Sequence, residues 1–362
     1  MQRTKIITIW QAFALLFISR IILFLTHSPD SIRAGNPLCS ALSVAVYFPV
    51  SLILLFPAYL LFHDNRDLNI LQMSDYAFGK IGKAIPVLIG LYLLRAGCVE
   101  LTRYNLFVST EVMTQESIVM LSLVMMFCAV LGAFMGIQGL ARSAGFFLIL
   151  IVAAIFFIFV ALIPEMQLTN VDPLVFQGVD SLGSGVLMVI SRSPEFIALF
   201  LLIPMIKGNL KKGAIWWTAG QLVCYLLIMI PSLFALGEFG KTQKYPYYAA
   251  AKLAQWSIFQ RLDAVHSAVW IAAVFLKLST LLFLFTICIS HLFGEKAGKI
   301  GLMAAGAAVA GAGILMAMHE NVFAFVNNDT IFMPISLFFA FFLPLLVWVF
   351  SILKKKKGRK SV

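Results

Sequence analysis

A helix break is predicted at residues 190–195, where the sequence reads Ile-Ser-Arg-Ser-Pro-Glu inside an apolar stretch long enough to cross a bilayer. An arginine near the bilayer centre costs about 2.5–3.5 kcal/mol on insertion scales. Pro194 lacks a backbone donor and disfavours helix at Ser193 before it. Because backbone freed by a break must face protein or a cavity rather than lipid, we expect two half-helices that border a site, as in transporter folds.

The first apolar stretch contains a related tripeptide, Ile18-Ser19-Arg20. If the chain is built from two inverted halves, Arg20 and Arg192 would meet near the bilayer midplane. Two arginines converging there would favour an anionic group, and their bidentate geometry suits a carboxylate. The alternative is that both arginines are fully occupied by internal acids and carbonyl oxygens.

Three residues beside Arg192 each have two candidate roles. Ser191 and Ser193 could cap the half-helices or contact a ligand. Glu195 follows the break directly, so it could interact with the amides that begin the second half-helix or with a ligand. The residue types alone do not decide between these roles.

Three further cations and one acid lie inside apolar stretches: Arg95, Glu100, Arg103 and Lys277. Charges at this depth should face the bundle interior and pair, or line water. Glu100 and Arg103 are three residues apart and share a helix face, but Arg103 lies near the outer end and is expected to extend to the interface. Lys277 could serve proton coupling or pair with Glu195 or Glu100.

Tyr92 and Tyr104 could wall the same site, although tyrosines at helical spacing more often serve packing. The candidate ligand-binding residues are therefore Ser19, Arg20, Tyr92, Arg95, Glu100, Ser191, Arg192, Ser193, Glu195 and Lys277. The sequence shows no Cys/His cluster with metal-ligand spacing, no phosphate-binding loop and no Ser-His-acid set. We therefore predict no metal, no cofactor and no enzymatic activity.

The composition indicates which solvent surrounds these residues. Hydrophobic residues make up 61% of the 362 positions and charged residues 12%, against about 25% charged in soluble domains. Because each apolar stretch is about twenty residues long, the chain is predicted to be an all-α polytopic membrane protein. The net charge of +11 does not indicate nucleic acid, since the basic residues lie mostly at the ends of these stretches.

We expect ten transmembrane helices in a single domain. Their approximate bounds are 6–26, 38–61, 83–108, 117–137, 144–164, 183–206, 214–236, 263–289, 299–318 and 330–353. They divide into two repeats of five, at about 6–164 and 183–353, followed by a basic tail at 354–362. With five crossings each, the second repeat must be inverted relative to the first. Two polar segments, 67–80 and 247–260, are expected to lie along the membrane surface.

The distribution of lysine and arginine predicts the orientation. If the N-terminus is cytoplasmic, seventeen of these residues lie on the cytoplasmic side, six of them in the tail, and five lie on the other side. Cytoplasmic segments of membrane proteins carry the excess of positive charge. Both termini are therefore expected to be cytoplasmic.

Several segments resemble the spore-germination permeases, the B subunits of nutrient germinant receptors. They are Gln-Gly-Leu-Ala-Arg-Ser-Ala at 138–144, the long stretch 245–277, and the Pro-Glu-Phe break at 194–196 followed by Leu-Leu-Ile-Pro at 201–204. The basic tail fits the same family. The likeness extends over nearly the whole chain.

This resemblance implies a LeuT-like five-plus-five inverted repeat with a broken sixth helix, in the amino acid–polyamine–organocation superfamily. It also implies recognition of small nutrients, often amino acids, in the inner membrane of a dormant spore. The implied partners are a larger membrane A subunit and a lipoprotein C subunit, besides the nutrient and the lipid bilayer. Relatives commonly carry Gly at a break in the first helix, whereas residues 17–21 here contain neither Gly nor Pro. Arg20 or Arg192 could therefore bind the carboxylate that helix-one amides usually capture.

Three functions remain open at this point. The first is a ligand-sensing, transporter-like subunit of a germinant receptor, which binds a small polar nutrient between the first, third, sixth and eighth crossings. The second is a proton-coupled amino-acid permease that acts alone as a secondary transporter. The third is a scaffold subunit whose pocket binds nothing.

Overall fold

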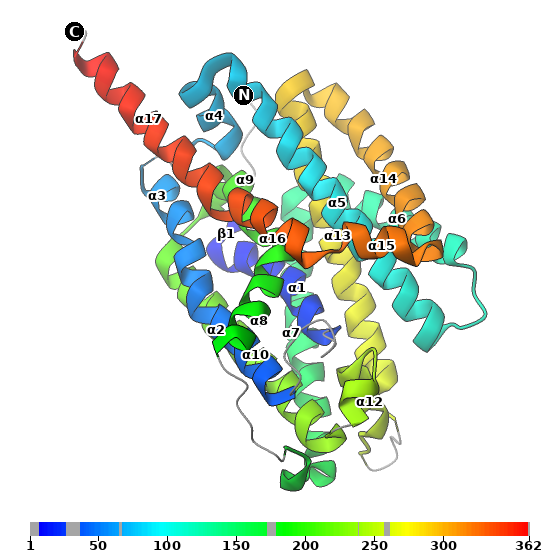
Figure 1. Ribbon diagram of the computed structural model, residues 1–362. Coiled ribbons are helices and arrows are strands. Elements are labelled where there is room, and N and C mark those ends of the chain that lie inside the picture. Colours follow the sequence, from blue (N-terminus) through cyan, green and yellow to red (C-terminus); the bar gives the residue numbers. More distant parts are fainter. Residues whose placement is uncertain are drawn as a thin grey trace.

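The computed structural model describes residues 7–26, 37–64, 67–171, 179–237, 239–256 and 261–360, which are almost entirely helical (Figure 1). The first half contains β1 (Ile7–Thr8), α1 (Ile9–Leu25), α2 (Pro37–Leu54), α3 (Phe56–Asp64), α4 (Ile70–Phe78), α5 (Ala84–Phe107), α6 (Ile118–Phe134) and α7 (Gly136–Leu162). A 3₁₀ turn (Gly79–Lys83) joins α4 to α5, and a π-helical turn (Val108–Val112) follows α5.

The second half begins with the two short helices α8 (Val179–Ser191) and α9 (Glu195–Leu202) and the strand β2 (Ile206–Lys207). Then follow α10 (Leu210–Leu236), α11 (Phe239–Thr242), α12 (Pro246–Leu253), α13 (Asp263–Phe293), α14 (Glu295–Met318), α15 (Glu320–Val326), α16 (Asp329–Leu337) and α17 (Leu343–Lys360). A π-helical turn (Phe338–Phe342) joins α16 to α17. The helix α17 continues into the basic residues of the tail.

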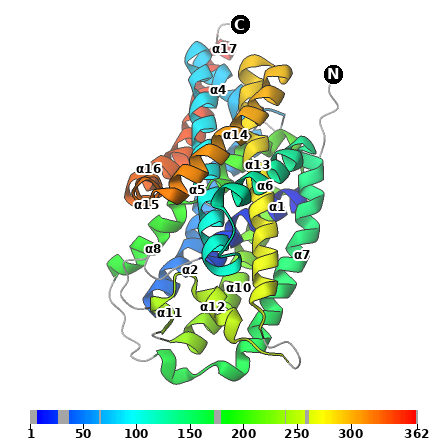
Figure 2. The ribbon, with the colours of Figure 1, turned by 90° about the vertical axis from the view of Figure 1, so that its right-hand side faces the viewer.

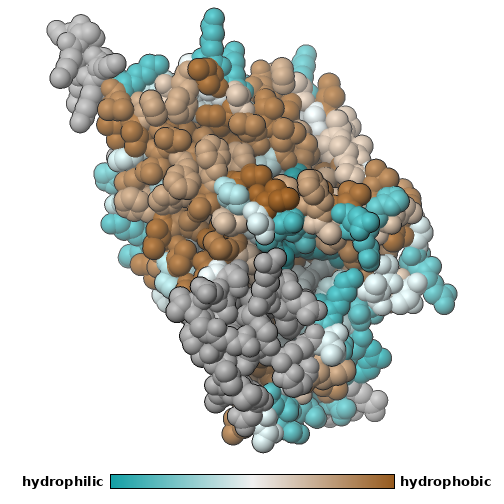
Figure 3. Space-filling model, in the orientation of Figure 1, coloured by the Kyte–Doolittle hydropathy of each residue, from teal (hydrophilic) through white to brown (hydrophobic). Residues whose placement is uncertain are grey.

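Six helical segments are long and apolar enough to cross a membrane by length and composition. They are Ile70–Val112, Gly136–Glu165, Leu210–Leu236, Asp263–Phe293, Glu295–Met318 and Glu320–Lys355. Four shorter apolar helices, Ile9–Leu25, Ala45–Leu61, Ile118–Phe134 and Glu195–Met205, overlap the remaining expected crossings. Hydrophobic residues cover most of the upper part of the face shown in Figure 3, as expected for a surface in contact with lipid. The exact number of ten crossings stays a prediction.

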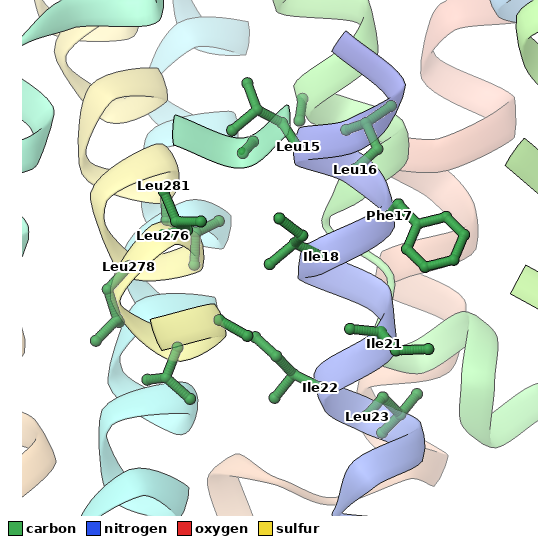
Figure 4. Close-up of a cluster of buried hydrophobic side chains, with 14 of the residues drawn as sticks. Leu15, Leu16, Phe17, Ile18, Ile21, Ile22, Leu23, Leu276, Leu278 and Leu281 are labelled. Atoms are coloured by element: carbon green, nitrogen blue, oxygen red, sulfur yellow. The ribbon is translucent and has the colours of Figure 1, made fainter. Parts of the chain in front are cut away.

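The central helix is α1, which is buried on nearly every side after Gln11. It packs against α7, α10 and α13, and Figure 4 shows its isoleucines and leucines next to Leu276, Leu278 and Leu281 of α13. A helix surrounded by other helices needs no polar face, which explains why its sequence is apolar apart from Gln11, Ser19 and Arg20. Thr8 and Gln11 form a capping box at its start, and β1 pairs in parallel with β2.

The predicted break in the sixth crossing is confirmed. The helix α8 ends at Ser191 and α9 begins at Glu195, with Arg192, Ser193 and Pro194 between them outside regular helix. In contrast, α1 runs without interruption through Ser19 and Arg20. The sixth crossing is therefore broken and the first is not, which answers a question that the absence of Gly and Pro at residues 17–21 left open.

Close helix packing accompanies the glycine- and alanine-rich sequence of α14. A Cβ atom on Gly306 would lie 2.5 Å from Cγ2 of Val130 in α6, and one on Gly313 would lie 2.7 Å from Cδ2 of Leu101 in α5. Small residues let helix backbones approach in this way. The small residues of α14 thus serve close packing against α5 and α6.

The two polar segments expected at the membrane surface form short helices in the described residues. The first contains α4, which packs against α17 and leads into α5. The second contains α12, where Lys252 forms a 2.8 Å ion pair with Glu111. Residues 257–260 of that segment lie outside the described residues, and its position relative to a membrane stays a prediction.

Candidate ligand site at the helix break

A sealed ionic cluster joins α1 to the break. Arg20 is completely buried and donates to Oε2 of Glu195 at 2.9 Å, to the Val189 carbonyl at 3.1 Å and to the Ser193 hydroxyl. Ser19 donates to the other oxygen of Glu195 at 2.9 Å. Both oxygens of this carboxylate are therefore occupied, and its charge balances that of the arginine.

The other residues of the break form a second ion pair, with the start of α16. Arg192 donates from Nε and one terminal nitrogen to the two oxygens of Asp329, at 2.9 and 2.6 Å. Ser191 also donates to this carboxylate. The pair is partly accessible, with 14% of the Arg192 side chain and 29% of the Asp329 side chain exposed. Asp329 thus binds as a free ligand carboxylate would bind to an arginine–serine pair.

A third ion pair connects α5 to α13. Nζ of Lys277 lies 2.8 Å from Oε2 of Glu100, and both side chains are almost fully buried. The second oxygen of Glu100 has no hydrogen-bond partner among the described residues. The prediction that an acid would pair with an intramembrane cation is therefore confirmed twice, by Glu195 with Arg20 and by Glu100 with Lys277.

Two other arginines of α5 contact the short connection between α15 and α16. Arg95 donates from two nitrogens to the carbonyl of Val326, at 3.2 and 2.9 Å, and lies over the ring of Phe332. Arg103 donates to Oδ1 of Asn327 at 2.7 Å. Both acceptors, the Val326 carbonyl and the Asn327 amide oxygen, are electrically neutral, so none of these hydrogen bonds offsets the charge of a guanidinium group.

These groups surround one small cavity that is partly open to solvent. Helix α5 contributes residues spaced three or four apart along one face, and the break, α13 and the α15–α16 connection supply the rest. Figure 2 shows α15 and α16 together at the side of the molecule, next to α5 and above α8. The lining residues are Tyr92, Arg95, Ala96, Val99, Glu100, Arg103, Ser191, Arg192, Pro194, Lys277 and Asn327.

The structure brings six of the ten candidate residues to this cavity: Tyr92, Arg95, Glu100, Ser191, Arg192 and Lys277. The other four, Ser19, Arg20, Ser193 and Glu195, form the sealed cluster instead. Arg20 and Arg192 therefore do not converge on one anion. At the break, Ser193 and Glu195 bind Arg20, whereas Ser191 and Arg192 bind Asp329. The two arginines therefore have different partners.

Two expectations about α5 need correction or refinement. Arg103 was expected to extend to the membrane interface, but it lines the cavity because Asn327 binds it there. Tyr104 stacks on Trp270 with ring centroids 6.2 Å apart, in a packing role. Tyr92 does line the cavity, and its hydroxyl donates to Ser336, which in turn donates to the Ser191 carbonyl at 2.8 Å.

Sequence reasoning missed Asn327, Asp329 and Ser336. The signal for the first two was the run Asn-Asn-Asp at 327–329, which had been taken as a polar loop between two crossings. An acid at the start of an apolar stretch is a candidate partner for an intramembrane arginine. Only the folded chain shows that this loop meets the helix break.

The comparison with protein families decides the assignment. The sequence profile of the family described as "Spore germination protein" matches residues 7–324. The chain belongs to this family. A search of curated proteins found no match.

Solved transporters share the architecture of this germination protein. A Na⁺-coupled sialic acid symporter in a substrate-bound outward-open state is 12% identical, with 92% of this chain and 80% of that chain covered and a TM-score of 0.61. Mhp1, a nucleobase-cation-symport-1 family transporter bound to bromovinylhydantoin, is 15% identical, with 89% and 75% covered and a TM-score of 0.56. A mutant manganese transporter from Eremococcus coleocola is 13% identical, with 92% and 77% covered and a TM-score of 0.57.

At these identities the comparison shows the fold alone. The chain is an all-α, multi-pass membrane protein with the LeuT-like fold of these transporters, and its sixth helix is broken. Together with the family match, this makes it a transporter-like protein of the spore germination permease family.

Proposed function

We propose that this chain is the transporter-like membrane subunit of a spore nutrient germinant receptor, and that its cavity binds a small polar nutrient such as an amino acid to trigger germination. The observation that carries the proposal is the cavity itself, because it gathers charged groups from α5, α13 and the helix break at one place. A purely structural core would keep its charges matched, as at Arg20 and Glu195, since each unmatched desolvated charge is costly. Broken helices of transporter folds border ligand sites of this kind.

The proposed partners follow from family membership. The chain would assemble with a larger membrane A subunit and a lipoprotein C subunit in the spore inner membrane, with both termini cytoplasmic. The seventeen-to-five distribution of basic residues supports this orientation. Co-purification of tagged chain with the two other subunits tests the assembly.

The second candidate function is proton-coupled amino-acid transport. The buried ion pair between Glu100 and Lys277 favours it, because both groups can exchange protons and both border the cavity. Uptake of labelled amino acid into reconstituted vesicles, driven by a pH gradient, distinguishes transport from sensing. Binding without uptake supports the receptor proposal.

The test of ligand binding is a thermal-shift screen of the purified chain against amino acids, sugars and nucleosides. A bound ligand stabilises the folded state by mass action, by about 2.7 kcal/mol at a hundred times the dissociation constant. We expect at least one compound to stabilise the wild type. Arg192→Ala should weaken this response, because it leaves the carboxylate of Asp329 unpaired at the cavity wall, whereas Arg142→Ala, at an exposed position away from the cavity, should keep it.

A further inference from the structure

The charges that line the cavity do not balance. Its cations are Arg95, Arg103, Arg192 and Lys277. The described acids that pair with them are Glu100, which pairs with Lys277, and Asp329, which pairs with Arg192. Four positive charges meet two negative charges, so two guanidinium groups remain uncompensated, on Arg95 and Arg103.

These two arginines of α5 differ from Arg20 and Arg192 in the groups that accept their hydrogen bonds. Arg20 and Arg192 each hold a carboxylate, at 2.9 and 2.6 Å. Arg95 and Arg103 instead donate to a backbone carbonyl and a side-chain amide of two consecutive residues, Val326 and Asn327. A carboxylate or phosphate would balance the charge of a guanidinium group, which a neutral acceptor does not.

We propose that Arg103, with Arg95 on the same face of α5, is the subsite that binds an oxyanion of the ligand, and that the amide oxygen of Asn327 occupies this position until the ligand displaces it. A guanidinium group presents parallel donors that match a carboxylate or a phosphate. Arg192 does not supply this subsite, because Asp329 already binds its Nε and one terminal nitrogen and balances its charge.

Of these two arginines, Arg103 is the one whose loss should weaken oxyanion binding more. Arg95 has a second task, since it satisfies the last carbonyl of α15 and stacks on Phe332 at 3.4 Å. Arg103 donates one hydrogen bond to the connection, to the side chain of Asn327. Exchange of Asn327 for an oxyanion would therefore release the connection between α15 and α16 from α5 at this point, which links ligand binding to a movement of that segment.

This inference rests on the proposed ligand-binding function for the nature of the ligand, but it can be tested without knowing that ligand. The probes are acetate and inorganic phosphate, with acetamide as the uncharged counterpart of acetate. Each is titrated into the purified full-length chain at constant ionic strength while the melting temperature is measured. Any amino acid that responds in the nutrient screen is compared with its own carboxamide in the same way.

Arg103→Gln is the test variant, because it keeps a hydrogen-bond donor and removes the charge. We expect the wild type to bind acetate or phosphate at least about tenfold more tightly than acetamide, and Arg103→Gln to reduce this preference to about twofold or less. Arg103→Lys should restore part of it. Arg142→Gln is the matched control and should behave as the wild type.

Stability without added probe separates binding from a structural role. If Arg103 serves binding, Arg103→Gln should melt within about 2 °C of the wild type, since its uncompensated charge stabilises nothing. A clearly lower melting temperature with an unchanged preference for the anion would overturn the inference. An anion preference that depends on Arg103, without a response to any nutrient, would support the subsite and refute the proposed nutrient function.

Discussion

Two charge clusters share the break between α8 and α9, and they differ in how completely their charges are matched. Ser193 and Glu195 point to α1, where Arg20 is fully buried and one carboxylate balances its charge. Ser191 and Arg192 border the cavity, where two guanidinium groups keep uncompensated charge. Residues 191–195 thus border two different environments, a sealed cluster that stabilises the fold and the cavity that we propose recognises the ligand.

This difference follows from desolvation. A charge sealed from water must find an opposite charge and further hydrogen bonds, because the penalty of several kcal/mol per ion is otherwise not offset. Arg20 meets that demand through Glu195, Ser193 and the Val189 carbonyl. A charge at a cavity that water can enter can remain unmatched, and it then attracts an ion from outside.

The largest expected effect is on the sealed cluster. Glu195→Ala should lower the free energy of unfolding by about 3–5 kcal/mol, because it leaves Arg20 charged and buried without a partner. The paired replacement Arg20→Met with Glu195→Leu should recover most of this loss, since it removes both charges. Thermal and denaturant unfolding in detergent measure both variants. If the paired replacement is as unstable as Glu195→Ala, the cluster stabilises the fold by more than the balance of these two charges.

The next effect concerns the ion pair in the cavity wall. Lys277→Met should cost about 2–3 kcal/mol, less than the change at Glu195, because Glu100 borders the cavity and can bind water or a proton there. Unfolding of Lys277→Met and of the double variant Lys277→Met with Glu100→Gln gives the comparison. If the double variant is no more stable than the single one, Glu100 does not depend on Lys277 for its charge balance.

A smaller effect is expected at the partly exposed pair. Asp329→Asn should cost about 1 kcal/mol, because solvent weakens the attraction between Arg192 and Asp329. The freed guanidinium of Arg192 should also raise the affinity of the cavity for acetate. Melting curves with and without acetate test both parts. Loss of acetate binding in this variant would mean that Asp329 shapes the anion site rather than competing for it.

The smallest effect on stability is expected for Arg103→Gln, within about 0.5 kcal/mol of the wild type. Its hydrogen bond to Asn327 is replaceable by the glutamine amide, and the lost charge had no partner. Unfolding of this variant is compared with that of Arg142→Gln on the exposed surface. A loss of about 2 kcal/mol or more is on the order of a broken buried interaction. It would show that Arg103, like Arg20, stabilises the folded structure.

The sequence predicted the elements that local chemistry determines. Pro194 and the charges beside it predicted the break, whereas the absence of Gly and Pro near Ser19 left open whether α1 would be unwound, and the structure shows it unbroken. The cost of burying Arg20 and Lys277 predicted that each would pair with an acid. Choosing between Glu100 and Glu195 as partners required the folded chain, because both acids satisfy the same energetic demand.

The cavity was less predictable because distant segments build it. Asp329 and Asn327 follow α15 and are more than 130 residues from the break in sequence, so periodicity carries no sign of their contact with Arg192 and Arg103. The position of Arg103 near a helix end suggested an interfacial residue. The α15–α16 connection lies against that part of α5 and holds Arg103 at the cavity instead.

One paired measurement tests the division between the two clusters most directly: the melting temperature, with and without a stabilising anion, of Arg103→Gln and of Arg20→Met with Glu195→Leu. We predict that Arg103→Gln keeps the melting temperature and loses the response to the anion. We predict that the paired replacement melts somewhat below the wild type, since it recovers most but not all of the stability lost in Glu195→Ala, and that it keeps the response to the anion. The reverse pattern, with an unstable but responsive Arg103→Gln and an unresponsive paired variant, would contradict the account.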